Sequence, residues 1–186
     1  MEIRVVGAGE ATLIMQMGQL LVDGFREMAP DDWNTLEEGQ AEVLDVVEQG
    51  FALAALEGER VLGWIGGLPE YNGNVWELHP LVVAPGEQGR GIGRALVGVF
   101  EQQVAQRGGL TVFLGTDDQA GWTSLAGVDL YPDPLGHLAQ LQNVARHPFA
   151  FYQKLGYALV GVVPDANGPG KPDIFMAKRV GLPPPG

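Results

Sequence analysis

The chain has 186 residues, 46% of them hydrophobic and 18% charged, which is enough apolar material for one core in a globular protein. The absence of cysteine excludes disulfides, thiolate metal sites and a cysteine nucleophile, and it suits a cytoplasmic location. The net charge of −12 argues against nucleic acid as a partner, because phosphate backbones would be repelled. We expect one domain over residues 1–186 and no membrane association, since no window approaches the ~20 apolar residues of a span.

The first part of the chain predicts a short strand, two helices and a hairpin. Residues 2–6 alternate as in a strand, and apolar residues recur at helical spacing from Leu13 to Met28. A second helix is predicted from Thr35, because Thr35 to Glu38 has the form of a capping box. Residues 51–56 and 61–68 flank a polar turn and predict a β-hairpin.

The segment that holds the second predicted helix is strongly acidic. Between Glu27 and Glu48 there are eight acidic residues and no Lys or Arg. A solvated helix face is the ordinary explanation of such a run, whereas clustered negative charge also attracts a cationic ligand. Composition alone leaves both explanations open. The acids are Glu27, Asp31, Asp32, Glu37, Glu38, Glu42, Asp45 and Glu48.

A strand over 75–83, a glycine-rich turn and an amphipathic helix follow in succession. Glycines at 89, 91 and 93 leave the backbone accessible, and the N–H groups of a helix start have no partner within the helix. The positive end of the helix dipole lies at the same point, beside Arg90 and Arg94. The segment therefore predicts a phosphate-binding loop, and a glycine turn without a ligand is the alternative.

Three kinds of phosphate loop have to be distinguished. A P-loop requires Gly-Lys-Ser/Thr, which is missing, and in a dinucleotide fingerprint the third glycine position falls on Arg94. The pattern Gln/Arg-x-x-Gly-x-Gly/Ala fits residues 88–93. This pattern resembles the acetyl-CoA pyrophosphate loop of the GNAT family of N-acetyltransferases.

The second half of the chain predicts a further strand, a short helix and a closing pair of strands. The helix after the glycine loop ends at Gly108-Gly109, and the apolar run 110–114 predicts a strand buried on both faces, followed by Gly115 to Asp118. The segment 119–146 shows no clear pattern apart from a turn at 131–134. A helix is predicted from near Pro148 to Gly156, and strands over 157–163 and 174–178 are expected to pair.

This order of elements predicts a mixed α+β fold around one twisted sheet with helices on both faces. A right-handed crossover would make the strands over 75–83 and 110–114 parallel neighbours. Pro80 lies inside the first of them and cannot donate to a ladder, so we expect that pair to be splayed. A splayed pair beside a phosphate loop would admit an extended thioester arm.

Further motifs make the resemblance to the GNAT family specific and extend it over nearly the whole chain. Residues 151–157, Phe-Tyr-Gln-Lys-Leu-Gly-Tyr, are similar to the helix-to-strand motif of the family, which carries a tyrosine near the CoA sulfur. The blocks 75–83, 114–118, 147–152 and 164–174 resemble the aminoglycoside 6′-N-acetyltransferases that confer antibiotic resistance. The resemblance implies a GNAT fold, acetyl-CoA as cosubstrate, a cationic aminoglycoside as acceptor and a homodimer.

The same resemblance assigns catalytic roles to three residues. It implies that Glu77 orients or deprotonates the amine, that the backbone carbonyl of His79 holds it, and that the Leu81 N–H polarises the thioester oxygen. Tyr152 would protonate the departing thiolate. These groups meet the three demands of acyl transfer to an ammonium, which are loss of a proton, stabilisation of an oxyanion and protonation of the leaving group.

Binding residues follow from the resemblance in the same way. The three histidines show no metal-ligand spacing, so no metal is expected. The implied substrate-binding residues are Trp33, Glu77, His79, Asp117 and Asp118. The implied cofactor-binding residues are Leu81, Val82, Val83, Gln88, Gly89, Arg90, Gly91, Ile92, Gly93, Arg94 and Tyr152.

One position departs from the pattern, and two other functions stay open. Many family members carry asparagine seven residues before the tyrosine, where this chain has Ala145, and Asn143 would replace it only with a rearranged helix start. An acetyltransferase acting on a polyamine or a protein amine would keep the same chemistry. A non-catalytic module that binds acyl-CoA would use the glycine-rich loop but would have no acetyltransferase activity.

Overall fold

The computed structural model describes residues 1–27 and 32–182 and divides into two compact units. The first unit comprises Met1–Val112 together with the segment that begins at Arg179, and the second comprises Phe113–Lys178. Met28 and Asp31, which belong to the predicted first helix and to the acidic run, lie outside the described residues. The single domain expected over residues 1–186 stays a prediction.

Four antiparallel strands form the sheet of the first unit, in the order β1-β2-β3-β4. The predicted strands and hairpin are confirmed, and the strand predicted over 75–83 has those bounds. A 3₁₀ turn, η1 (Tyr71–Gly73), joins the last two strands. The strands are β1 (Glu2–Val6), β2 (Phe51–Glu57), β3 (Arg60–Glu70) and β4 (Val75–Val83).

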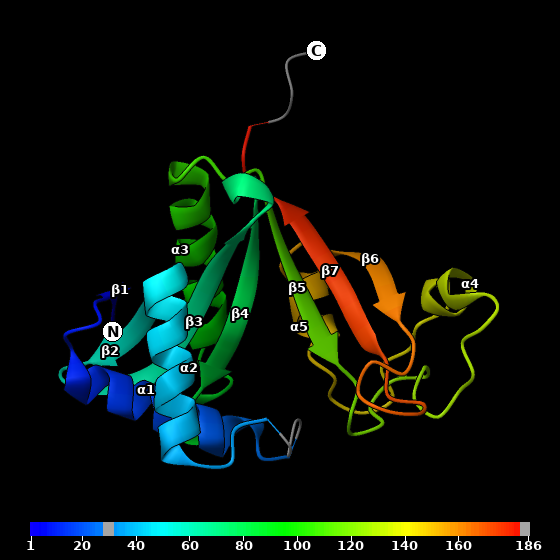
Figure 1. Ribbon diagram of the computed structural model, residues 1–186, viewed down its shortest axis with the longest axis horizontal. Helices are drawn as coiled ribbons and strands as arrows, with labels where there is room; N and C mark the ends of the chain where they lie inside the picture. Colours follow the sequence, from blue (N-terminus) through cyan, green and yellow to red (C-terminus); the bar gives the residue numbers. More distant parts are fainter. Residues whose placement is uncertain (28–31, 183–186) are drawn as a thin grey trace. The chain divides into compact units, whose positions relative to one another are not determined.

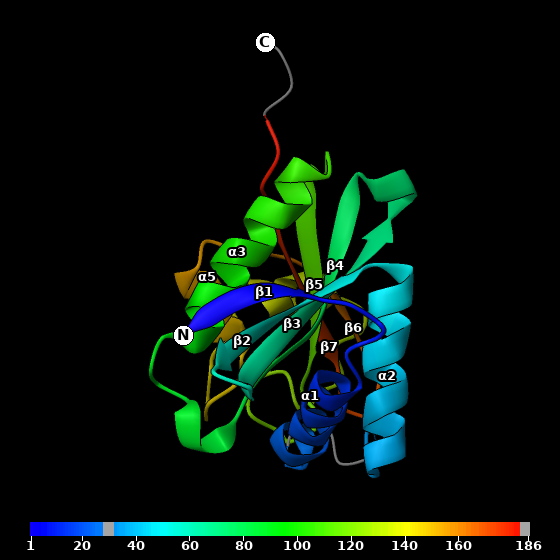
Figure 2. The same cartoon turned by 90° about the vertical axis from the view of Figure 1, so that its left-hand side faces the viewer.

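Helices cover both faces of this sheet. The helices α1 (Ala11–Phe25) and α2 (Leu36–Gln49) lie on one face, and α3 (Ile92–Gln106) lies on the other (Figures 1 and 2). The first two helices approach each other at Gly18 and Gly39. A Cβ on Gly18 would lie 2.7 Å from the Gln40 nitrogen, so this contact requires glycine.

The capping box predicted at the start of α2 is present. The Thr35 hydroxyl accepts a hydrogen bond from the Glu38 N–H at 3.2 Å, and the Glu38 carboxylate accepts from the Thr35 N–H at 2.9 Å. These two bonds satisfy backbone donors that a helix start leaves without partners. The acidic segment therefore enters its helix at the residue that the sequence indicates.

The core of the first unit lies between the sheet and the pair α1 and α2. Trp64 on β3 is fully buried, and its indole N–H donates to the Met17 carbonyl of α1 at 3.0 Å, which satisfies the polar atom of a large buried ring. Further buried members are Ile14, Leu21, Val43, Val46, Ala54 and Val82. This packing fixes α2, and with it the acidic run, against the strands.

The second unit holds three strands in the order β5-β7-β6, with β6 and β7 antiparallel. The prediction for β5 was wrong in two respects: Gly115 to Asp117 belong to the strand, and burial alternates along it instead of covering both faces. Asp118 begins the loop that follows. The elements are β5 (Thr111–Asp117), α4 (Pro134–Ala139), α5 (Phe149–Lys154), β6 (Ala158–Val163) and β7 (Asp173–Arg179).

The segment 119–146, for which the sequence showed no clear pattern, contains α4 beside β6 (Figure 1). The Asp133 carboxylate accepts from the Gly136 N–H at 3.0 Å, and Pro134 is the first helical residue. Asp at the N-cap followed by Pro is a helix-start signal that could have located it. Leu125, Leu130, Leu138 and Ile174 form a small core around it.

The mixed α/β class is confirmed. The strand over 75–83 lies in the first unit, whereas the strand predicted over 110–114 crosses the boundary between the units after Val112, so the splayed pair expected between them stays a prediction. In the part of the chain that the structure describes, no helix has the length and apolar character needed to cross a bilayer.

Candidate active site

One side of β4 carries the predicted catalytic residues of the first unit. Burial alternates strictly along this strand, as expected when successive side chains point to opposite faces. Glu77, His79, Leu81 and Val83 lie on the partly exposed side. Val82, a predicted cofactor-binding residue, lies on the buried side at 5% exposure, which leaves only its backbone for such a role.

The pairing of β4 with β3 is irregular at His79 and Pro80. Gly67 pairs with Leu78 and Ile65 pairs with Leu81, so β4 has one residue more than β3 between these pairs. Such a bulge leaves backbone groups outside the regular ladder. This irregularity concerns the pairing of β4 with β3, whereas the interruption predicted from Pro80 concerns the strand over 110–114 and stays a prediction.

A carboxylate of the acidic run reaches β4. Glu42 of α2 lies 3.2 Å from His79 Nε2 through one oxygen, and its other oxygen accepts from the Trp33 indole N–H at 3.4 Å. The Trp33 ring also contacts the rings of Phe25 and His79, with centroids 5.0 and 6.0 Å apart. Two predicted substrate-binding residues, Trp33 and His79, are thus brought together around an acid that the sequence did not single out.

Charge and burial shift the pKa values of this cluster. Burial raises the pKa of Glu77, and the charge of His79 lowers it by less. Burial alone would lower the pKa of His79, but the hydrogen bond to Glu42 and the charges of Glu42 and Glu77 outweigh it, so that pKa is raised. The His79 hydrogen bond in turn lowers the pKa of Glu42. Glu77 is therefore the stronger base of the two carboxylates.

The glycine loop follows β4 through a 3₁₀ turn, η2 (Pro85–Glu87). Gly89 and Gly91 have φ values of 79° and 83°, which only glycine adopts without strain, and Gly91 caps α3. Apart from the neighbouring residues in the chain, no described residue has an atom within 4 Å of a Cβ built on either glycine. The loop is open toward solvent at the start of a helix, which suits a phosphate group.

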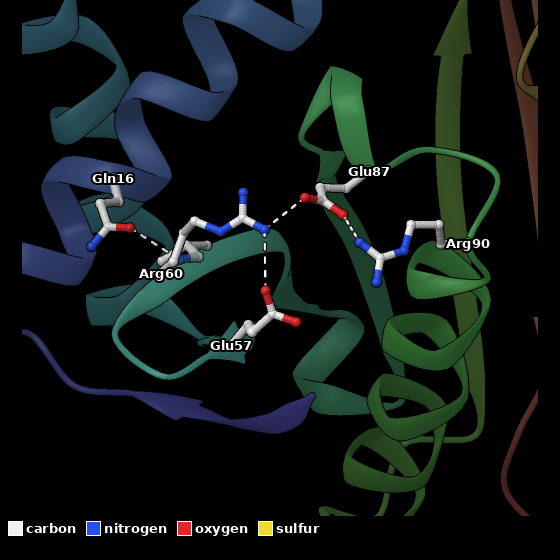
Figure 3. Close-up of polar contacts among 6 residues, drawn as sticks. Gln16, Glu57, Arg60, Glu87 and Arg90 are labelled. Carbon is white, nitrogen blue, oxygen red and sulfur yellow. Dashed lines mark hydrogen bonds and ion pairs between the residues drawn. The ribbon is translucent and has the colours of Figure 1, made fainter.

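The two arginines of the loop differ in their partners. Arg90 forms an ion pair with Glu87, which also accepts from Arg60 at 2.6 Å (Figure 3). Arg94 is exposed in the first turn of α3 and makes no ion pair within residues 1–27 and 32–182. Arg94 therefore offers a cation without an ion-pair partner among these residues, whereas Arg90 is paired with Glu87.

Tyr152 lies on α5 in the second unit. Its side chain is 7% exposed, and its ring packs edge-on against Phe151 and Tyr157 with centroids 5.1 and 5.6 Å away. Burial raises the pKa of the Tyr152 hydroxyl above its usual value, so the proton is held at neutral pH. This is the protonation state that a proton donor needs.

The two aspartates at the end of β5 are in different surroundings. Asp118 is 1% exposed, and its two oxygens accept from the Trp122 and Thr123 N–H groups at 2.6 and 2.8 Å. Asp117 is partly exposed and is hydrogen-bonded to the Asn167 amide. Their contact with substrate stays a prediction, and for Asp118 it would require the buried carboxylate to become accessible.

His147 was not predicted as a functional residue, yet it connects β5 to α5. Its Nε2 lies 3.0 Å from the Asp117 carbonyl oxygen, and its Nδ1 accepts from the Phe149 N–H at 3.3 Å. The Asn143 side chain bonds both backbone groups of His147, so it braces this turn. The sequence signal that could have pointed to it is its place at the start of the block 147–152, which carries the family resemblance.

The described residues thus form two groups, one in each unit. Trp33, Glu42, Glu77 and His79 lie around α2 and β4, while Asp117, His147 and Tyr152 are linked through β5 and α5. Within the described ranges no three His, Asp or Glu side chains are placed to hold a metal ion. The catalytic and binding roles of these residues stay predictions.

Comparisons with known proteins point to one family. Residues 14–121 match the acetyltransferase (GNAT) family. Among solved structures, an aminoglycoside 6′-N-acetyltransferase complexed with coenzyme A is 40% identical with a TM-score of 0.90, and that from Enterococcus faecium is 40% identical with a TM-score of 0.85. An aminoglycoside 6′-acetyltransferase type Ii is 36% identical with a TM-score of 0.72, and all three similarities cover 100% of both chains. The comparison with curated proteins finds no match.

Proposed function

Because the chain belongs to the GNAT acetyltransferase family, we propose that it transfers the acetyl group of acetyl-CoA to the 6′-amino group of aminoglycosides by direct attack in a ternary complex. The observation that carries this proposal is the 40% identity, over the full length of both chains, to an aminoglycoside 6′-N-acetyltransferase with bound coenzyme A. The carboxylates around α2 and β4 support it, because aminoglycosides are polycations.

Substrate recognition rests on negative charge arranged on the first unit. Glu42 and Glu77 come from a helix and a strand that face each other across His79, and the chain as a whole carries a net charge of −12. Such a surface raises the local concentration of a polycation and orients its amines. The Trp33 ring adds an apolar wall against which a sugar ring would pack.

The amine must be neutral before it attacks. In the proposed reaction Glu77 accepts a proton from the ammonium, directly or through a water molecule, and its raised pKa makes it a better base than an ordinary carboxylate. The His79 carbonyl, which lies at the bulge in β4, holds the amine. The nitrogen then forms a bond to the acyl carbon, and the bond from that carbon to sulfur breaks.

The chain supplies groups for the two charges that develop. The Leu81 N–H, just after the bulge, donates to the thioester oxygen as negative charge grows on it. The Tyr152 hydroxyl, kept protonated by its raised pKa, gives its proton to the departing sulfur, and the second proton that the nitrogen loses restores this hydroxyl. The products are an amide, which no longer carries the 6′ positive charge, and free CoA.

Residues of the loop fit the cosubstrate. Gly89 and Gly91 keep the backbone open at the start of α3, and Arg94 is exposed beside it. We assign the pyrophosphate of acetyl-CoA to the N–H groups of residues 88–93. Acetyl-CoA contributes the activated acetyl group when bound.

The finer biological assignments belong to the same proposal. Loss of a positive charge weakens aminoglycoside binding to anionic targets, so the activity would confer resistance. We propose a cytoplasmic location, where acetyl-CoA is available, and a homodimer, as the family resemblance implies. Light scattering of the purified protein tests the dimer, and expression in a sensitive host tests resistance.

Thiol release from acetyl-CoA in the presence of kanamycin or tobramycin tests the proposal. We expect turnover with aminoglycosides that carry a 6′-amine and none with analogues that carry a 6′-hydroxyl. Spermidine and a peptide amine serve as competing acceptors. No turnover on any aminoglycoside with a 6′-amine would contradict the proposed acceptor. A strong preference for spermidine would identify a polyamine as the acceptor instead.

A further inference from the structure

The loop assigned to acetyl-CoA is tied to the β2–β3 hairpin by a buried carboxylate. Glu87 ends the turn η2, and its side chain is 12% exposed. It accepts from Arg60 Nη2 at 2.6 Å and from Arg90 Nη1, so it lies between the hairpin and the loop (Figure 3). A carboxylate with so little exposure is stable only when it is paired, and here two guanidinium groups pair it.

The hairpin that supplies Arg60 is itself anchored. Gln16 of α1 donates to the Glu59 carbonyl at 3.0 Å and accepts from the Val61 N–H at 2.9 Å, on either side of Arg60. The side chain of Arg60 therefore projects from a turn whose backbone is held by a helix. The ion pair between Glu87 and Arg60 connects the glycine loop to this anchored hairpin.

The guanidinium group of Arg90 is bonded to Glu87 through Nη1. Its ion pair with Glu87 offsets its charge, and the same pairing with Arg60 and Arg90 lowers the pKa of Glu87, so the carboxylate stays ionised. Arg94, in the first turn of α3, has no ion-pair partner within the described ranges. The two arginines of the motif thus differ in that only Arg90 is paired with a carboxylate.

We propose that Glu87 is a positioning residue that uses Arg60 and Arg90 to hold the loop 88–93 in its acetyl-CoA-binding shape, and that Arg94 alone supplies the cation for the pyrophosphate. This inference rests on the proposed binding of acetyl-CoA at the loop. It reverses the simplest expectation for Arg90, which is that its charge contacts the phosphate directly.

The two assignments of Arg90 predict opposite effects of Glu87→Gln on CoA affinity. If Arg90 is a brace, the substitution loosens the loop and raises the Kd for CoA by about fivefold, as for the loss of one good ion pair. If Arg90 is a phosphate ligand, the same substitution frees its charge and lowers the Kd. Calorimetric titration of the purified full chain with CoA distinguishes these outcomes.

Four further variants extend the experiment. Arg90→Gln should raise the Kd by no more than Glu87→Gln does, because it removes one of the two ion pairs of Glu87 whereas Glu87→Gln removes both, and the double variant should be no worse than Glu87→Gln. Arg94→Gln should flatten the salt dependence of CoA binding, which Glu87→Gln should leave unchanged. Glu57→Gln is the matched control, since Glu57 also contacts Arg60, at 3.3 Å, but is exposed and does not contact the loop.

A general loss of structure is separated from a loss of positioning by three readouts. The thermal midpoint reports folding, the KM for acetyl-CoA should rise while kcat at saturation and the KM of the amine stay unchanged, and Arg60→Lys should retain part of the affinity. Unchanged or tighter CoA binding by Glu87→Gln would overturn this inference alone. Absence of CoA binding by the unaltered protein would overturn the proposed function as well.

Discussion

Two His-Pro dipeptides, one in each unit, have opposite surroundings. His79 lies on the partly exposed side of β4, where the carboxylate of Glu42 is hydrogen-bonded to its ring. His147 is 3% exposed, and its ring nitrogens are bonded to the Asp117 carbonyl and the Phe149 N–H. The hydrogen bond to Glu42 and the nearby negative charges raise the pKa of His79 despite its burial. Burial lowers the pKa of His147.

The difference shows how one dipeptide serves two purposes. A histidine paired with a carboxylate on an accessible face contributes charge and hydrogen bonds that a ligand encounters. A neutral histidine that bonds only backbone groups orders the chain around it, here the turn that leads into the tyrosine helix. Substitutions around His79 should therefore affect mainly activity, and substitution of His147 should affect mainly the free energy of unfolding.

The largest expected effect is on catalysis in the β4 region. Glu77→Gln should lower the turnover of a 6′-amine aminoglycoside by ~10²-fold, because general base catalysis is lost. Its free energy of unfolding should not fall, since a neutral amide avoids the cost of burying a charge. Steady-state kinetics and urea unfolding measure the two quantities. Glu70→Gln, an exposed carboxylate on the neighbouring strand, is the control, and equal losses in both variants would contradict the assignment.

The next effect is on stability in the α5 region. His147→Ala should lower the free energy of unfolding by about 1–3 kcal/mol, because buried backbone groups of Asp117 and Phe149 lose their partners. His79→Ala should cost less, since its ring is 37% exposed. Urea unfolding at neutral pH measures both, with His137→Ala as a third histidine for reference. A larger loss at His79 than at His147 would reverse the comparison.

The pH dependence of stability should have opposite signs in the two regions. For His147 the folded pKa lies below the unfolded value of 6.5, so the unfolded chain binds the extra proton and stability is lost as the pH falls below 6.5. For His79 the folded pKa lies above 6.5, so its contribution is complete below 6.5 and is lost as the pH rises through the folded pKa. The free energy of unfolding of each alanine variant, measured across this pH range, should lack the pH dependence that the replaced histidine contributes. Contributions of the same sign from His79 and His147 would refute the contrast.

The smallest effect is electrostatic screening of the substrate. Added salt should raise the KM of an aminoglycoside moderately, because a screened acidic surface attracts a polycation less well. Glu42→Gln should weaken this dependence, since Glu42 is the acid next to His79. Glu48→Gln, an exposed acid of the same helix, is the matched control. A KM that does not vary with salt in the unaltered protein would count against recognition by the acidic surface.

Elements that depend on neighbouring residues were predictable. The capping box of Thr35 and Glu38, the hairpin around 57–60 and the glycine loop each involve residues within a few positions of one another, and all three are present. The family resemblance also followed from short motifs, and the comparisons bear it out. Local backbone preferences and side-chain periodicity act over this range, so the sequence alone displays them.

Contacts between distant residues were decided only by the tertiary structure. The bonds of Glu42 with His79, of Arg60 with Glu87, and of His147 with Asp117 join residues 37, 27 and 30 positions apart. The eight acids of the run were equivalent in sequence, yet helix packing brings Glu42 to β4. The fold class and the loop were thus set by local chemistry, whereas the identity of the acid, the partner of Arg90 and the charge of each histidine depend on which segments pack together.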